Sequence, residues 1–295
     1  MTVDSEGILH LLDLEPIEKD IFRGAGLATS WRRTFGGLVI AQAALAAART
    51  VENRPIHSLH GYFILPGEST KPIIYQVERI RDGGSFSTRR CVAIQNGQTI
   101  FFLSASFHVA EEGFSHQTIM PDAPDPDTLP SLQQIVQRYG DIIPTPVRQY
   151  FDRGRPVELR PVDLGRYLPM KDGETRPAQQ KAWLRASQKL PDDPVIHRAV
   201  LAYMSDMTLL DTSLVTHGTT VFDPGIQAAS LDHALWFHRP FRADDWLLYV
   251  QDSPNANGAL GLTRGGIFAR NGDLVASVAQ EGLIRRRRPR PQAQG

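Results

Sequence analysis

The chain repeats part of its own sequence, and this repeat limits the folds that it can adopt more than any other feature. Short matches recur in the same order in the two halves of the chain, 174 residues apart for the first three and 175 for the last. The matching positions are Pro66 and Pro240, Tyr75 and Tyr249, Arg90 and Arg264, and Asn96-Gly97 and Asn271-Gly272. A repeat over such a distance predicts two copies of one subdomain rather than a solenoid of small units.

The composition is typical of a globular chain with a hydrophobic core. The chain has 295 residues, of which 41% are hydrophobic and 22% are charged, and its formal net charge is zero. The total charge therefore indicates neither a nucleic-acid partner nor a membrane surface. Cys91 is the single cysteine, so a reducing compartment is expected. No signal peptide is apparent, and the longest apolar stretch, 38–48, is too short to span a bilayer. We expect a cytoplasmic protein without a membrane span.

Each half is predicted to contain one long apolar helix and several antiparallel strands. In the first half, small apolar residues after Gly36-Gly37 predict a helix over 38–48 that is buried on most sides. In the second half, a helix begins after Pro194, and its apolar stripe continues to Leu210. The predicted strands are 58–65, 72–81, 86–95 and 99–109 in the first half, and 156–162, 179–187, 229–237, 246–252, 259–269 and 274–284 in the second.

These elements predict the domain organisation. A single helix laid across a sheet covers its apolar face, and two such halves could pair their sheets edge to edge within the chain. We place the first half at 1–110, a Pro- and Asp-rich linker with a short helix near 132–139 at 111–150, and the second half at 151–285. Residues 286–295 form a basic tail that we expect to be disordered. The tail is either a solvated terminus or a basic arm near a phosphorylated substrate.

Two polar residues lie where apolar neighbours predict burial. Asp206 flanks the apolar stripe of the second-half helix, and a carboxylate desolvated there is costly unless it is hydrogen-bonded or functional. The alternative is an exposed acid at the end of the helix. Gln280 shares one strand face with Ala276 and Val278, where its amide needs partners. The alternative is a buried glutamine that bonds only to backbone.

Ser230 is the third candidate, because Asp232 and His233 follow it directly. In a regular strand Ser230 and Asp232 point to one face and His233 to the other, so His233 is not expected to act as a base for Ser230. No Gly-x-Ser-x-Gly motif occurs, which argues against a nucleophilic serine. The histidines lack metal-ligand spacing and the glycine pairs lack dinucleotide-binding spacing, so we expect no metal and no cofactor.

Several longer segments carry a resemblance to a known family. They are SLDHALWFHRPF at 230–241, followed by DWLLY at 245–249, LVASVAQEG at 274–282, HSLHGYF at 57–63 and RDGGSF at 81–86. These segments resemble the acyl-CoA thioesterase II family over about residues 29–285. The resemblance implies an α+β double hotdog: two antiparallel sheets, each wrapped around a long central helix and packed as an internal repeat.

The resemblance also implies an activity and a site. The family hydrolyses acyl-CoA with an Asp, a Thr and a Gln that orient a water; these fall on Asp206, Ser230 and Gln280. Serine in place of threonine keeps the hydroxyl and loses a methyl group. At the offsets of the repeat, Ile56 stands for Ser230 and Ala105 for Gln280, so we expect one catalytic centre, in the second half. The expected partners are an acyl-CoA substrate and further copies of the chain, as a homodimer or a higher homo-oligomer.

Two alternative functions stay open from the sequence. The first is a hotdog enoyl-CoA hydratase, which needs an Asp with a His a few residues away; the nearest local match, Asp223-Pro224-Gly225, has no His close after it. The second is an acyl-CoA binding or sensing protein whose catalytic site has decayed.

Overall fold

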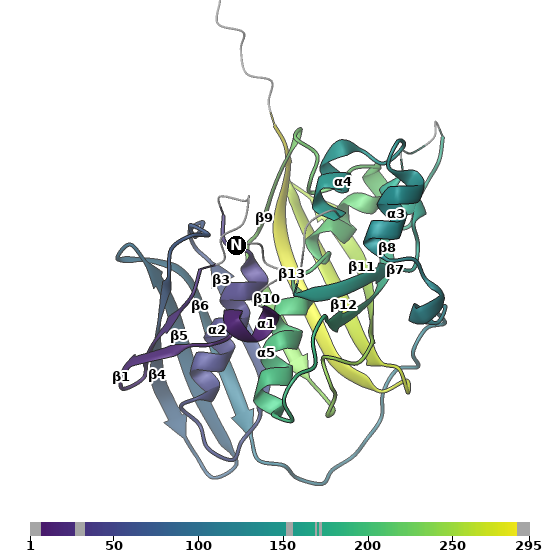
Figure 1. The fold of residues 1–295 in the computed structure, drawn as a ribbon. Helices are drawn as coiled ribbons and strands as arrows, with labels where there is room; N and C mark the ends of the chain where they lie inside the picture. Colours follow the sequence, from purple (N-terminus) through teal and green to yellow (C-terminus); the bar gives the residue numbers. More distant parts are fainter. Residues whose placement is uncertain (1–6, 27–32, 152–155, 169, 171–172, 288–295) are drawn as a thin grey trace, which may run out of the picture.

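The strands of both halves form one continuous antiparallel sheet in the computed structural model (Figure 1). The structure describes residues 7–26, 33–151, 156–168, 170 and 173–287. Within them the strand order is β1-β2-β4-β5-β6-β3-β10-β13-β12-β11-β8-β7, with β9 paired to β13. The two halves are joined where β3 (Ile56–Phe63) pairs with β10 (Asp232–Phe237). The edge-to-edge pairing of the halves predicted from the sequence is therefore present. The expectation of two separate sheets is wrong, because this pairing joins the strands of both halves into one sheet.

The remaining elements are listed here in chain order. The first half contains α1 (Gly7–Leu11), β1 (Glu15–Glu18), β2 (Ile21–Gly24), α2 (Gly36–Ala48), β4 (Ile73–Asp82), β5 (Phe86–Gln95) and β6 (Gln98–His108). A connecting region contains a 3₁₀ helix (Pro126–Thr128), α3 (Leu132–Tyr139) and α4 (Thr145–Phe151). The second half contains β7 (Val157–Pro161), a 3₁₀ helix (Gly165–Tyr167), β8 (Gln179–Ala186), α5 (Pro194–Ser205), a 3₁₀ helix (Leu210–His217), β9 (Ile226–Ser230), β11 (Leu247–Asn257), β12 (Leu260–Ala269) and β13 (Leu274–Arg286).

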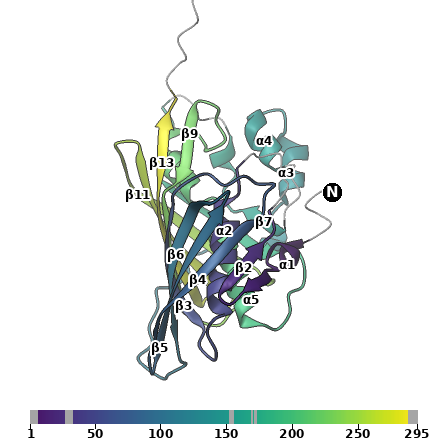
Figure 2. The same ribbon diagram turned by 90° about the vertical axis from the view of Figure 1, so that its left-hand side faces the viewer.

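Helices α2 and α5 pack against each other in the middle of the molecule, with the strands of the two halves on either side (Figures 1 and 2). Every residue of α2 from Gly37 to Ala47 is buried, as the run of small apolar residues predicts. Small side chains allow a helix to approach a second helix and a sheet at the same time. Helix α5 starts with Pro194 in its first turn and with the Asp193 carboxylate accepting a hydrogen bond from the Val195 N–H.

The predicted elements agree with the structure except at two places that matter for the site. The second-half helix ends at Ser205, although its apolar stripe continues to Leu210; Thr208 has a φ of 64°, which stops a right-handed helix. The predicted strand 229–237 is two strands, β9 and β10, that are interrupted at Leu231.

The two Asn-Gly pairs of the repeat both lie between paired neighbouring strands, but in loops of different length. Asn96 and Gly97 form a two-residue turn with φ values of 52° and 75°, which joins β5 to β6. Asn271 and Gly272 lie in a longer loop between β12 and β13. Residues 111–125 of the predicted linker have no helix or strand, and the predicted short helix is α3. Helices α1 and α4 and strands β1 and β2 were not predicted.

No helix in the described part of the chain combines the length and the apolar character needed to cross a membrane. Of the predicted basic tail, residues 288–295 lie outside the described residues.

The contact between the two central helices depends on a missing side chain at Gly37. A Cβ atom there would lie 2.4 Å from the backbone oxygen of Tyr203 in α5. Gly37→Ala is therefore expected to lower the free energy of unfolding by about 1–3 kcal/mol, since the backbone must move to relieve the overlap. Urea denaturation measures this change. Gly84→Ala, which adds a Cβ with no atom within 4 Å, is the control, and an equal loss in both variants would contradict the prediction.

Candidate active site

The three site residues predicted from the sequence meet at one place, although they come from separate elements. Asp206 is the C-cap of α5, Ser230 ends β9, and Gln280 lies within β13. The Gln280 Nε2 donates a hydrogen bond to Ser230 Oγ at 2.5 Å. Both side chains also interact with the Asp206 carboxylate. The structure thus brings the three groups together, while their catalytic roles stay a prediction.

The Asp206 carboxylate lies at the N-terminus of α2, a helix of the other half. The backbone N–H of Gly37 interacts with it, and a Cβ on Gly36 would lie 2.8 Å from Oδ2. The N-cap residue of α2, Phe35, provides no side-chain hydrogen bond. The first N–H groups of a helix are left without intrahelical partners, and the helix dipole there favours negative charge. Asp206 therefore occupies the position that a capping carboxylate would take.

Burial dominates the electrostatics of Asp206. Desolvation raises the pKa of Asp206 to about 7, against the opposing effects of the Gly37 N–H, Gln280 and Ser230, which favour the charged form. The Oδ1 atom is buried and has no hydrogen-bond partner among the described residues. A carboxylate whose pKa is near 7 has the proton affinity that suits a general base at neutral pH. Its free oxygen is available to accept a proton.

Strand β11 fixes the end of α5 and with it the position of Asp206. The Tyr249 hydroxyl donates to the Ser205 backbone oxygen at 2.7 Å. The Gln251 side chain donates to the Met207 backbone oxygen at 3.3 Å and to Thr208 Oγ1 at 2.8 Å. These side chains provide partners for backbone carbonyls that a helix leaves unpaired at its C-terminus. Neither Tyr249 nor Gln251 was predicted from the sequence to have this role.

The expectation that Ser230 and His233 point to opposite faces is wrong. Ser230 pairs with Gly282 of β13, whereas Ala234 pairs with Ala279, so the register shifts by one residue where Leu231 interrupts the strand. The shift places His233 opposite Gln280, on the same face as Ser230. The alternation rule holds only within an uninterrupted strand. The described residues show no hydrogen bond between His233 and Ser230.

His233 is a buried partner of Gln280, whereas from the sequence it was considered only as a base for Ser230. Its Nδ1 lies 3.1 Å from Gln280 Oε1, and its Nε2 lies 2.8 Å from Ser205 Oγ. Burial lowers the pKa of His233 to about 4, opposed by the hydrogen bond with Gln280. His233 is therefore neutral at pH 7. The sequence did not show that the strand is interrupted at Leu231, so the contact between His233 and Gln280 was not predicted.

Two other features do not belong to this site. Cys91 is fully buried in the core, and burial raises the pKa of its thiol far above the usual range, which disfavours the nucleophilic thiolate. Among the described residues no group of three or more His, Cys, Asp or Glu side chains could hold a metal ion.

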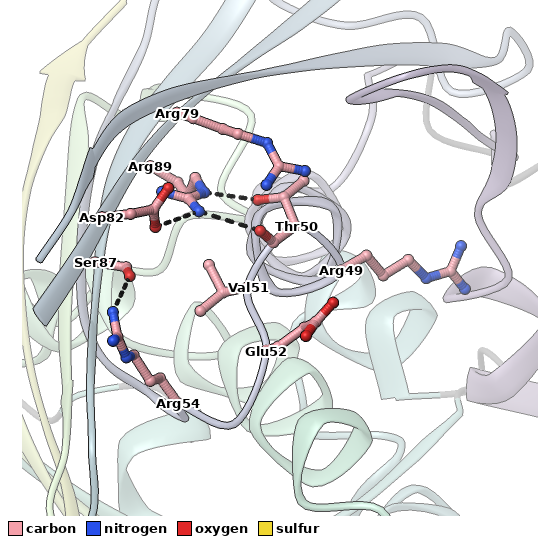
Figure 3. Close-up of a pocket in the computed structure, with 9 residues that line it drawn as sticks. All are labelled: Arg49, Thr50, Val51, Glu52, Arg54, Arg79, Asp82, Ser87 and Arg89. Atoms are coloured by element: carbon pink, nitrogen blue, oxygen red, sulfur yellow. Dashed lines mark hydrogen bonds and ion pairs between the residues drawn. The ribbon is translucent and has the colours of Figure 1, made fainter. Parts of the chain in front are cut away.

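A cavity of about 290 Å³ lies at the opposite end of α2, where four arginines gather (Figure 3). Its most buried arginine, Arg89, binds the Thr50 side chain and backbone and the Asp82 carboxylate. Arg54 binds Ser87, and Arg79 binds Asp20 outside the cavity. These guanidinium groups already have partners in the fold, and the C-terminal end of a helix disfavours anions. We therefore interpret the arginines around this cavity as structural residues of the first half and not as a ligand site.

Comparisons with known proteins agree with the resemblance found in the sequence. A family model described as acyl-CoA thioesterase matches residues 147–283, and one described as acyl-CoA thioesterase N-terminal domain matches residues 27–108. Acyl-CoA thioesterase 2 of Haemophilus influenzae is 40% identical over 279 residues, which cover 94% of this chain and 96% of that protein. The chain belongs to the acyl-CoA thioesterase II family.

Solved structures extend this agreement to the fold. The crystal structure of acyl-CoA thioesterase II TesB2 from Mycobacterium marinum matches with a TM-score of 0.77 and 46% identity, and covers 95% of this chain and 98% of that one. A protein of unknown function with a hot dog fold from Alicyclobacillus acidocaldarius matches with a TM-score of 0.71 at 19% identity. The match covers 95% of the present chain and 98% of the Alicyclobacillus chain. The hotdog fold expected from the resemblance is confirmed.

The raised pKa of Asp206 predicts how stability changes with pH. The folded chain keeps the Asp206 proton from about pH 4 to about pH 7, whereas the unfolded chain releases it near pH 3.8, so this group lowers stability as pH rises through that range. Asp206→Asn removes this pH-dependent loss of stability, because asparagine does not ionise. Relative to the wild type, this variant is expected to gain about 1 kcal/mol or more between pH 4 and pH 7, measured by urea unfolding.

The control for that measurement is Asp245→Asn, which removes an exposed surface carboxylate. It is expected to follow the wild type across the pH range. A constant difference between Asp206→Asn and the wild type at every pH would show that Asp206 ionises as it does in water.

Proposed function

We propose that the chain hydrolyses acyl-CoA thioesters to free fatty acid and CoA by means of a water held by Asp206, Ser230 and Gln280. Membership of the thioesterase II family makes it a thioester hydrolase. The observation that carries the proposed site is the buried, unpaired Oδ1 of Asp206 beside the hydrogen-bonded pair Gln280–Ser230. A buried carboxylate oxygen without a partner is costly unless another molecule binds it.

In the proposed mechanism, Asp206 Oδ1 accepts a hydrogen bond from the water and takes its proton as the water attacks the thioester carbonyl carbon. The Gln280 amide and the Ser230 hydroxyl orient the water, which removes much of the entropic cost of the attack. The tetrahedral intermediate then collapses, the C–S bond breaks, and the electron pair leaves with sulfur as the CoA thiolate. The thiolate afterwards takes the proton held by Asp206, which restores the carboxylate. The thiol formed from CoA has a pKa of about 8.5 if it resembles a free cysteine, so it departs with little acid assistance. No covalent acyl-enzyme forms.

We infer that each chain has one catalytic centre, built by the second half and closed by the first. Strands β4 and β5 begin 174 residues before β11 and β12, in keeping with two copies of one hotdog unit. At corresponding positions the first half has Ile56 and Ala105 instead of Ser230 and Gln280. The first half instead contributes the N-terminus of α2, whose Gly37 N–H meets Asp206. The homo-oligomeric state and the cytoplasmic location stay predictions from the sequence.

Replacing the groups that hold the water tests the proposal. Asp206→Asn and Gln280→Ala are each expected to lower kcat by about 10²-fold or more, because a donor or acceptor to the reacting groups is lost. Release of free CoA thiol from acyl-CoA of several chain lengths measures kcat. The matched control is Glu281→Gln, the neighbour of Gln280 that faces the other side of β13. Normal turnover in both site variants would refute the assignment.

The same assay separates hydrolysis from the binding or sensing alternative. Tight binding of acyl-CoA by the wild type without release of CoA would favour a binding or sensing protein and refute hydrolysis.

Ser230 variants distinguish an orienting hydroxyl from a nucleophile. Ser230→Thr restores the residue of the family pattern and keeps the hydroxyl, so it is expected to keep kcat within about threefold, whereas Ser230→Ala is expected to lose about tenfold or more. Mass spectrometry of the protein quenched during turnover is expected to show the unmodified mass. An acyl group on Ser230 would overturn the water mechanism.

A further inference from the structure

The Gln280 amide can adopt two orientations that differ by exchange of its oxygen and nitrogen atoms. It can orient a water only if one of these two orientations is fixed. The amide oxygen and nitrogen differ in hydrogen-bonding character but hardly in shape, so packing alone does not choose between them. The choice matters here, because the side chain of Gln280 faces the Asp206 carboxylate. With its Nε2 on that side the amide offers N–H donors to Ser230 and Asp206. With its Oε1 there, an acceptor would face a carboxylate.

His233 is placed to make this choice. Its Nδ1 lies 3.1 Å from Gln280 Oε1 on the side of the amide away from Ser230. A carbonyl oxygen can only accept, so Nδ1 must carry the proton. In a neutral imidazole Nε2 is then the acceptor. The Ser205 Oγ lies 2.8 Å from this nitrogen and 2.9 Å from the Ala202 backbone oxygen, so its single proton must point to Nε2 rather than to Ala202. His233 is neutral at pH 7, which permits this tautomer.

We propose that His233 is a positioning residue for the hydrolysis, which acts through Gln280: its Nδ1–H fixes the Gln280 amide so that Nε2 points to Ser230 and Asp206. This inference rests on the proposed function, because it deepens the role of Gln280 in the same site.

The first half of the chain offers an internal comparison. At the offsets of the repeat, the facing pair His233 and Gln280 corresponds to Leu59 and Ala105, which pair directly across β3 and β6. All four side chains are at most 1% exposed. The fold thus accepts an apolar pair at this place in the sheet, so packing does not require the polar pair. Burial of an imidazole and an amide has a cost that the apolar pair avoids, which indicates a role in the chemistry.

A double-mutant cycle between the two residues tests the proposal. The variants are His233→Leu, Gln280→Ala and the double variant, which recreates the Leu59–Ala105 pair and is therefore expected to fold. His233→Leu is expected to lower kcat about tenfold with KM within about twofold, and the double variant is expected to match Gln280→Ala within about twofold. If the two losses multiply, or if His233→Leu turns over normally, His233 does not act through Gln280.

Two further measurements distinguish a positioning role of His233 from a general loss of structure in the His233→Leu variant. His233→Asn retains an N–H donor near the position of Nδ1 and is expected to recover most of the activity lost in His233→Leu. In the ¹⁵N spectrum of the wild type, with His233→Leu for assignment, the nitrogen bearing the proton is expected to be Nδ1; protonation at Nε2 alone would overturn the proposal. This readout does not depend on turnover. Absence of thioesterase activity in the wild type would instead refute the proposed function.

Discussion

The site depends on one contact between the two halves, in which the C-terminal end of α5 packs on the N-terminal end of α2. The contact is close because Gly36 and Gly37 have no side chains: a Cβ at either position would overlap Asp206, Phe63, Phe35 or Tyr203. It places the Asp206 carboxylate against the Gly37 N–H and away from water. Burial raises the pKa of Asp206 and leaves Oδ1 unpaired. The reactivity that we propose thus originates in helix packing.

The second constraint is the interruption of the strand at Leu231. Without it, Ser230 and His233 would lie on opposite faces of the sheet. The one-residue shift in register places both beside Gln280, which then bonds to Ser230 through Nε2 and to His233 through Oε1. β-Bulges often redirect side chains near functional sites. Here the irregularity assembles a buried polar network from residues that a regular strand would separate.

The two halves share a pattern of strand pairing but differ at the positions of the polar network. The strands of the first half pair in the same pattern, but the positions that correspond to the polar network carry Ile56, Leu59 and Ala105. The first half instead contributes the N-terminus of α2, whose Gly37 N–H contacts the Asp206 carboxylate. The site therefore needs both halves, although its polar side chains come from one.

The sequence by itself determined the two central helices and most strands of the sheet, the pairing of the halves and, with the family resemblance, the three residues that meet at the site. Local patterns carry this information: alternation in β5 and β13, small apolar residues in α2, and a polar side chain on an apolar face at Asp206 and Gln280. The tertiary structure alone decided where α5 ends, which face Ser230 and His233 share, and that Gly37 meets Asp206. These depend on pairing and packing between segments far apart in the chain, and a residue's neighbours in sequence do not fix the register of a distant strand.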